Sequence, residues 1–572
     1  MDLSDENRIA CREAVMSEDY GDFLVTVNGT EEQIKEEFGA ECVQILSRKY
    51  AVITIPIVQR ENIIKYGFIY SAIPKLYGLM DTSNIENIGV QRVRNAAYLD
   101  LFGRNVLIGF IDTGIDYTNS VFKNADNTSR IYRIWDQTIQ TGEPPTGLYY
   151  GTEYTKEQID RALTTDNPLE VVPTTDENGH GTFMAGIAAG NIDEANDFTG
   201  IAPQSEIMMV KLKPSKTIFR EYYFVNPNAV SYQETDILLG VRYLVERARE
   251  AGRPLILCLG VGTNSGGHDG NSILDEYLSE ASDGYQACII VPTGNEANYG
   301  GHYRNTLRED ETFKDIEIRV GENEVGFSLE LWANAPSVYT VGFISPSGEY
   351  IQRIPPRTDG NQTVSFLFEP TTIYVGYRVV ELRTGDELIL MRFNRPTPGI
   401  WKVRVFMEQN FNNPFDLWLP IQEFLSSDTQ FIQPDPDITI TSPGNTEAII
   451  TVAAYNHMNN AIFINSGRGF TRSGRIKPDI TAPGVNIYGP LPGNQFSVRS
   501  GTSIAAAHAA GAAALLMEWG VVQQNNTFFD TSDVKALMIK GARRSEGTYP
   551  NREYGYGTLD VFGAFESLRT TL

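Results

Sequence analysis

The sequence predicts an α/β protein with a three-layer core, in which a mainly parallel sheet carries helices on both faces. Continuous apolar runs such as residues 105–112 are typical of strands buried on both sides in a parallel sheet. Residues 503–519, rich in Ala and Leu and free of Pro, predict a buried helix. Eight short β-rich runs between residues 308 and 441 predict an all-β unit inserted into this core.

The first 81 residues are predicted to form a separate small α+β unit. Residues 23–27 alternate as a strand, and a Thr-Glu-Glu-Gln capping box opens a helix at residues 30–38. Residues 42–56 supply two further strands, and a second helix is expected at residues 59–71.

The inserted unit, residues 308–441, divides the core into residues 82–307 and 442–572. Its runs are separated by Gly, Pro and Asn turns, and their number suggests a β-sandwich of jelly-roll type. A unit joined by two links either clamps the core and shapes access to it or serves only as packing. The eight runs are residues 316–320, 326–332, 338–344, 363–368, 372–379, 387–393, 399–406 and 415–419.

Three segments of the core carry side chains suited to acyl transfer. A buried strand ends in Asp112, at the edge where open α/β sheets place their sites. A polar loop leads His180 into a small-residue helix, and imidazole has an unperturbed pKa near neutrality. Ser503 stands at a helix start, where unpaired N–H groups can stabilise an oxyanion. We therefore expect His180 to deprotonate Ser503 while Asp112 orients the imidazole; Asp116 is the less favoured carboxylate.

Three motifs in this order resemble those of the subtilisin-like serine proteases. They are Asp-Thr-Gly-Ile-Asp (112–116), Asn-Gly-His-Gly-Thr (178–182) and Gly-Thr-Ser-Ile-Ala-Ala (501–506). Taken alone, Ser503 would be read as an N-cap on a buried helix, but the other two motifs favour a nucleophile. The resemblance implies a subtilisin-like three-layer core and endopeptidase activity. One departure is Ala507, where many relatives carry Pro; Ala is the better helix former, so no loss of activity is expected.

The same resemblance assigns further site residues. Asn295, after an apolar strand, is expected to donate to the oxyanion together with the Ser503 main chain. Gly260, Val261 and Gly262 are expected to bind the substrate main chain, because Gly permits another backbone to come close.

The full domain plan looks like that of the clostridial Csp-type germination proteases. In that family the N-terminal unit is a propeptide that templates folding, is cut off by the enzyme and stays bound in the active-site groove. The resemblance places the cut at Met80, Asp81 or Thr82. It also implies a protein substrate, the precursor of a spore cortex-lytic enzyme, and association with the spore. An N-terminal domain that is never cleaved, and a pseudoprotease scaffold with an occluded groove, remain the alternatives.

Other chemistries lack support in the sequence. There is no second Asp-Thr/Ser-Gly for an aspartic protease, and no Gly-x-Ser-x-Gly elbow around Ser503 for a lipase. There is no His-Glu-x-x-His, phosphate loop or Cys-x-x-Cys, so neither a metal nor a cofactor is expected. The formal net charge of −25 opposes binding to nucleic acid or anionic lipid.

The remaining expectations concern cysteines, histidines and location. Four cysteines are too few and too scattered for a disulfide framework, and Cys258 and Cys288 fall in apolar strands as buried thiols. His268, His302 and His457 lie in polar stretches and are expected to be solvated. The N-terminus has neither a basic nor an apolar export region, and no run of eighteen apolar residues occurs, so cytoplasmic synthesis without a membrane span is expected.

Overall fold

The computed structural model describes most of the chain. The described residues are 5–27, 29–57, 70–79, 88–96, 98–283, 286–308, 310–356, 361–409, 411, 413–425, 428–545 and 547–569.

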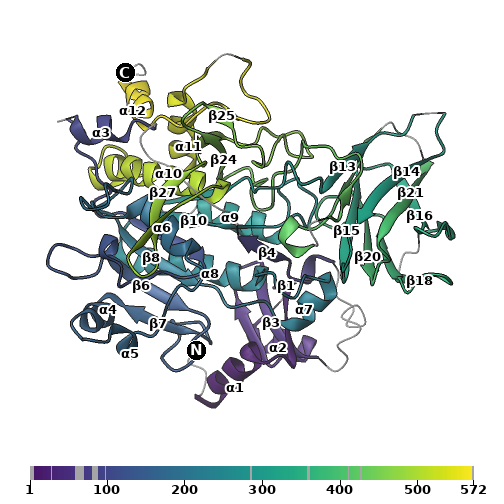
Figure 1. Ribbon diagram of the computed structural model, residues 1–572. Helices are drawn as coiled ribbons and strands as arrows, with labels where there is room; N and C mark the ends of the chain where they lie inside the picture. Colours follow the sequence, from purple (N-terminus) through teal and green to yellow (C-terminus); the bar gives the residue numbers. More distant parts are fainter. Residues whose placement is uncertain are drawn as a thin grey trace.

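A mixed nine-stranded sheet forms the centre of the molecule (Figure 1). Its strand order is β25-β24-β12-β10-β5-β8-β6-β7, with β26 paired to β24. The central pairs are parallel, and only β7 and β25 run antiparallel to their neighbours. The strands are β5 (Leu107–Asp112), β6 (Ile131–Asp136), β7 (Thr152–Thr155), β8 (Glu206–Lys211), β10 (Leu255–Leu259), β12 (Ala287–Pro292), β24 (Ile450–Asn456), β25 (Ala461–Ile462) and β26 (Ile480–Pro483).

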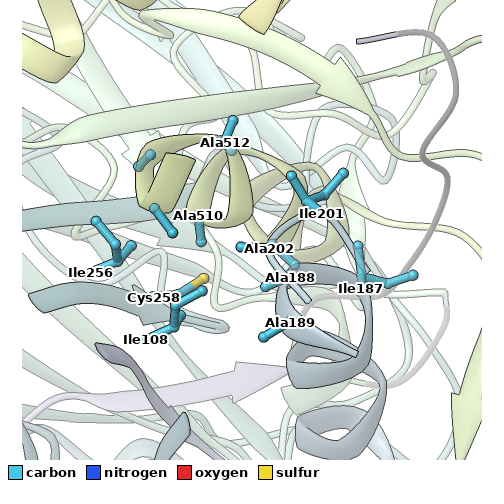
Figure 2. Close-up of a cluster of buried hydrophobic side chains, with 14 of the residues drawn as sticks. Ile108, Ile187, Ala188, Ala189, Ile201, Ala202, Ile256, Cys258, Ala510 and Ala512 are labelled. Carbon is cyan, nitrogen blue, oxygen red and sulfur yellow. The ribbon is translucent and has the colours of Figure 1, made fainter. Parts of the chain in front are cut away.

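Helices cover both faces of this sheet, which confirms the three-layer α/β core. Ile108 and Phe110 of β5 join one apolar cluster, whereas Leu107 and Ile111 join another, as the two-residue period of a strand requires. The first cluster includes Ala189 and Ala510 packed near Ile108, Ile256 and Cys258 (Figure 2). The helices of the first face are α3 (Val90–Asn95), α6 (His180–Ala189), α10 (Thr502–Met517), α11 (Thr531–Gly541) and α12 (Val561–Arg569); those of the second are α8 (Glu234–Ala251) and α9 (Ile273–Ser282).

The N-terminal unit, from α1 to β4, has its own antiparallel sheet with the order β1-β3-β2. The expected helix at residues 30–38 is confirmed as α2, and the Thr30 side chain and Gln33 form the reciprocal capping box. The expected helix at 59–71 falls largely on residues 58–69, outside the described residues. The elements are α1 (Asp5–Met16), β1 (Tyr20–Thr26), α2 (Glu31–Phe38), β2 (Cys42–Ile45), β3 (Tyr50–Pro56) and β4 (Leu76–Leu79).

Cysteine pairing differs from the expectation. Cys11 of α1 and Cys42 of β2 form a disulfide, although they are 31 residues apart in sequence. The spacing of the cysteines did not predict this single cross-link, because it is the packing of the helix on the sheet that brings the two Cα atoms to 5.0 Å. Cys258 and Cys288 are buried and unpaired, as predicted.

The chain between β12 and β24, which are neighbours in the central sheet, forms two antiparallel sheets to one side of that sheet (Figure 1). We call the segment from β13 to β23 the β insert; each of the eight expected runs corresponds to a strand within it. Its sheets share one apolar core and have the orders β13-β22-β15-β20-β19-β18 and β17-β16-β21-β14-β23. The strands are β13 (His302–Asn305), β14 (Phe313–Val320), β15 (Gly326–Ala333), β16 (Val338–Ile344), β17 (Tyr350–Ile354), β18 (Asn361–Ser365), β19 (Thr372–Arg378), β20 (Glu387–Asn394), β21 (Gly399–Gln409), β22 (Phe415–Trp418) and β23 (Gln430–Phe431).

Shorter elements complete the described structure. Among the described residues, Thr502–Val522 is the one segment with the length and composition of a membrane-spanning helix. Of its apolar 18-residue stretch, 89% is buried inside the protein. The remaining elements are α4 (Lys156–Leu163), α5 (Pro168–Val171), α7 (Thr217–Tyr223), β9 (Tyr232–Gln233), β11 (Val261–Gly262), and the hairpin of β27 (Ile487–Leu491) and β28 (Gln495–Arg499).

Replacing Cys42 with Ser is expected to destabilise the N-terminal unit, because the disulfide no longer ties α1 to β2. Cross-links that close loops of this size contribute about 2–4 kcal/mol to the free energy of unfolding. Calorimetry of the wild type with and without reductant, beside Cys42→Ser, measures the effect. Cys288→Ser, at a buried unpaired thiol, shows what loss of a buried Sγ does without loss of a cross-link. Melting of the wild type that is insensitive to reductant would contradict the prediction.

Candidate active site

Asp112, His180 and Ser503 meet in one hydrogen-bonded line. Asp112 Oδ1 lies 2.7 Å from His180 Nδ1, and His180 Nε2 lies 3.0 Å from Ser503 Oγ. All three residues are at most 2% exposed. The carboxylate can only accept, so Nδ1 carries the proton in this pair, and Nε2 is left to accept the proton of the serine hydroxyl.

Each of the three residues stands at the end of a secondary-structure element. Asp112 ends β5, His180 is the first residue of α6, and Ser503 is the second residue of α10. Gly179 precedes α6 with φ of 81°, a conformation that favours glycine. Strand ends and helix starts therefore converge at the carboxyl edge of the parallel sheet, where the sequence predicted the site.

Asn295 lies beside the nucleophile, three residues after the end of β12. Its Oδ1 accepts hydrogen bonds from Thr502 N at 3.1 Å and from Thr502 Oγ1 at 3.2 Å. These contacts fix the orientation of the amide, so the other branch of the side chain is the two-donor Nδ2 group. Asn295 is thus anchored to the residue directly before Ser503, as an oxyanion donor would need to be.

The acid next to Asn295 is held uncharged. Burial raises the pKa of Glu296 to about 8, opposed by the hydrogen bond from Gln422 N and supported by the charge of Glu423. At neutral pH the carboxyl group is therefore mostly protonated. An uncharged neighbour does not repel negative charge that develops near Asn295.

Gly260 lies beside Asp112 and His180, and Val261 and Gly262 follow it in the chain. Val261 and Gly262 form β11, which pairs antiparallel with β4 of the N-terminal unit. On its other edge β4 pairs antiparallel with β9, so β4 is the middle strand of a small three-stranded sheet. Met80, Asp81 and Thr82, the expected cleavage positions, follow β4 and lie outside the described residues.

Glycine at position 260 is also required by contacts inside the protein. A Cβ atom there would lie 2.2 Å from Asp112 Oδ2 and 2.8 Å from His180 Cε1. These close neighbours are the side chains of the carboxylate and the imidazole. Gly260 is therefore the residue that leaves room for the Asp112–His180 contact.

Asp176 is a site residue that sequence reasoning missed. It is 3% exposed, and its Oδ1 accepts from Thr113 Oγ1 at 2.8 Å and Gly179 N at 2.9 Å. Its Oδ2 accepts from Thr182 N at 2.9 Å and Thr182 Oγ1 at 2.7 Å. Asp176 thus connects Thr113, which follows Asp112, to Gly179 and Thr182, which lie on either side of His180 in sequence. Its place four residues before His180, where a carboxylate can cap the following helix, was the available signal.

The other histidines do not enter this site. His268 and His302 were expected to be solvated, but they are 3% and 1% exposed and both stack on Trp418. His508 is buried and its Nδ1 donates to Ile504 O at 2.8 Å; burial lowers the pKa of His508 to about 3. No cluster of three or more His, Cys, Asp or Glu side chains suited to a metal ion occurs among the described residues.

The fold and this site define a subtilase. The Subtilase family model matches residues 103–347 and 432–557, and the chain belongs to that family. The stretch left unmatched between these two segments, residues 348–431, contains β17 to β23 of the β insert. The structure of the Clostridium perfringens CspB protease is similar, with 30% sequence identity and a TM-score of 0.76 over 85% of this chain and 97% of that one.

Curated relatives match parts of the chain. Serine protease AprX of Bacillus subtilis is 35% identical over 143 residues, which cover 22% of this chain and 31% of the relative. The C5a peptidase of Streptococcus pyogenes is 22% identical over 448 residues, which cover 73% of this chain and 35% of the relative. The chain thus spans about a third of the length of these curated relatives.

Asp176→Asn is expected to lower peptidase turnover about 10–100-fold with little change in KM. The amide replaces an acceptor oxygen with a donor that faces other donors, and hydrogen bonds to charged groups contribute about 1.5–3 kcal/mol each. Steady-state kinetics and the pH dependence of turnover measure the effect, since a displaced imidazole changes both. Glu177→Gln is the matched control, because Glu177 is adjacent, 74% exposed and outside this network. Turnover equal to wild type in Asp176→Asn would refute the positioning role.

Proposed function

We propose that the protein is a serine endopeptidase that hydrolyses peptide bonds through Asp112, His180 and Ser503. The observation that carries the proposal is the continuous hydrogen-bonded line from Asp112 Oδ1 through the imidazole to Ser503 Oγ. Its position in a subtilase framework supports the same conclusion.

The chemistry follows from the donors and acceptors in this line. His180 Nε2 takes the proton of Ser503 as Oγ attacks the scissile carbonyl carbon, and Asp112 stabilises the imidazolium that forms. The carbonyl oxygen becomes negative, and Asn295 Nδ2 and the Ser503 N–H at the start of α10 donate to it. The imidazolium then gives its proton to the leaving amine. Water, deprotonated by the same imidazole, releases the acyl group from Ser503.

We further propose that residues 1–81 are a propeptide that the enzyme removes from itself. The support is β4, whose main chain lies between β9 and β11 as an added strand, the mode in which extended peptides bind to sheet edges. The last residue of β4, Leu79, lies opposite Val261, directly after Gly260. The proposed cut is at Met80 to Thr82, with the propeptide left bound in the groove.

Finer points of the domain plan belong to the same proposal. The catalytic core comprises residues 82–307 and 442–572, and residues 308–441, joined by β13 from the residues just before them, form a jelly-roll sandwich whose two sheets enclose one apolar core. The resemblance to Csp-type germination proteases adds, as the proposed protein substrate, the precursor of a spore cortex-lytic enzyme.

A second candidate function is a scaffold in which the groove stays closed. It is favoured by the same observation, because β4 occupies the strand position between β9 and β11. Self-cleavage separates the two candidates, since a scaffold of this kind does not need to cut its own chain.

The purified wild-type protein is expected to consist of two fragments. Cleavage near residue 81 releases a piece of about 9 kDa, from the mean residue mass of this 63.7 kDa chain of 572 residues. Ser503→Ala is expected to remain a single chain, because the nucleophile is missing. Intact mass and denaturing gels test both. Ser545→Ala, a change at an exposed serine, is the control and is expected to be cut as the wild type. An uncut wild type would favour the scaffold.

Asn295→Ala is expected to reduce kcat by about 10²–10³, the usual effect of removing one oxyanion donor. KM is expected to change little, because the interaction strengthens only as negative charge develops. Kinetics on the same peptide substrate for wild type and variant give both constants. Thr441→Val, at a buried residue whose Oγ1 donates to Thr293 O at 3.4 Å, controls for disturbance near the end of β12. A variant whose loss lies entirely in KM would contradict the assignment.

A further inference from the structure

We infer that the β insert is a receptor for the N-terminal unit and keeps it docked on the core after the chain is cut. This inference rests on the proposed propeptide role. The insert contributes two polar junctions and one apolar surface to the contact. Each brings together residues from the N-terminal unit, the core and the insert.

The first junction is built on a buried carboxylate of the insert. Glu330 of β15 is 3% exposed, and its Oε1 accepts from Tyr70 OH of the N-terminal unit at 2.5 Å. Its Oε2 accepts from Gly266 N of the core and from Trp332 Nε1, both at 2.9 Å. The Tyr70 ring also meets Trp332 edge to face, with centroids 6.2 Å apart. A buried carboxylate requires its donors, so loss of Tyr70 OH removes part of what compensates its burial.

The second junction is built on the turn between β19 and β20. Arg383 Nη2 donates to Tyr50 OH at 2.9 Å, and Arg383 Nε donates to Asn271 O of the core at 2.8 Å. Glu276 of α9 pairs with Arg383 and also accepts from Lys49 and Tyr50 of the N-terminal unit. Arg383 and Glu276 are 20% and 29% exposed, so this junction is the weaker of the two.

An apolar surface supports these polar contacts. Phe23 and Ile53 of the N-terminal sheet, Phe219 of α7, and Ile421 and Phe424 of the insert belong to one buried cluster. The rings of Phe23 and Phe219 meet edge to face at 5.7 Å. The sheet of the N-terminal unit thus packs against both the core helix α7 and the insert segment that follows β22.

None of these contacts depends on the covalent link between β4 and α3. Tyr50 and Tyr70 precede the proposed cut, whereas Glu330 and Arg383 are far beyond it in sequence. Cutting the link therefore leaves both junctions and the apolar surface in place. After the cut, the insert remains a third surface that contacts the N-terminal unit, in addition to strands β9 and β11 and the core helices.

The test measures how fast the N-terminal fragment leaves the cut protein. Full-length Ser503→Ala carries a recognition sequence for a site-specific protease between β4 and α3, and that protease makes the cut. This design separates docking from self-cleavage, so an inactive wild type overturns the proposed function without deciding the inference. Dilution followed by size exclusion and gels gives the dissociation rate. In this background Tyr70→Phe and Glu330→Gln are compared with Glu317→Gln, an insert carboxylate 38% exposed and paired only with Lys402 among the described ion pairs.

Tyr70→Phe and Glu330→Gln are each expected to accelerate dissociation about tenfold or more, the effect of losing a buried hydrogen bond to a charged group. Glu317→Gln is expected to match the parent. If Glu330→Gln does not fold, as judged by thermal melting, Tyr70→Phe and Arg383→Ala decide the outcome. Equal dissociation rates for the parent and the junction variants would overturn the inference. Acceleration by Glu317→Gln of the same size would overturn it as well.

Discussion

The close packing of α6 against α10 on one face of the central sheet is the constraint on which the site depends. A Cβ atom on Gly511 of α10 would lie 2.8 Å from Ala188 O and 2.3 Å from Ile201 Cβ. The two helices therefore approach more closely than a side chain at that position allows. Their first turns present His180 and Ser503, and a wider separation would break the 3.0 Å contact between Nε2 and Oγ.

Three buried carboxylates hold together segments that are distant in sequence. Asp176 joins the β5 end to α6, and Glu330 joins the N-terminal unit, the core and the insert. Glu518, after α10, accepts from Phe102 N at 2.7 Å and Gly103 N at 2.6 Å. An unpaired buried charge is costly, so each carboxylate tolerates little displacement of its donors. The structure around Asp112, His180 and Ser503 is held by these hydrogen-bond networks as well as by apolar packing.

The β4 strand connects the architecture to the proposed regulation. β9 and β11 are short strands whose facing edges would otherwise present unpaired main-chain groups. β4 forms main-chain hydrogen bonds with both β9 and β11, and the side chain of Tyr77 in β4 is fully buried. In our proposal a substrate forms the same main-chain contacts, so the N-terminal unit and substrate compete for the strand position. Any surface that lengthens the stay of the N-terminal unit, as the β insert does in our proposal, lowers access to the triad.

The local sequence was sufficient to predict most secondary-structure elements and to single out Asp112, His180 and Ser503. The capping box at Thr30, the apolar run that ends in Asp112 and the Ala-rich stretch after Ser503 each depend on neighbours within a few positions, and each element formed where expected. The three-dimensional arrangement alone determined the Cys11–Cys42 disulfide and the four hydrogen bonds of Asp176. It also determined why residue 260 is glycine. These features arise between segments that are remote in sequence, and their geometry exists only once the sheets and helices have packed.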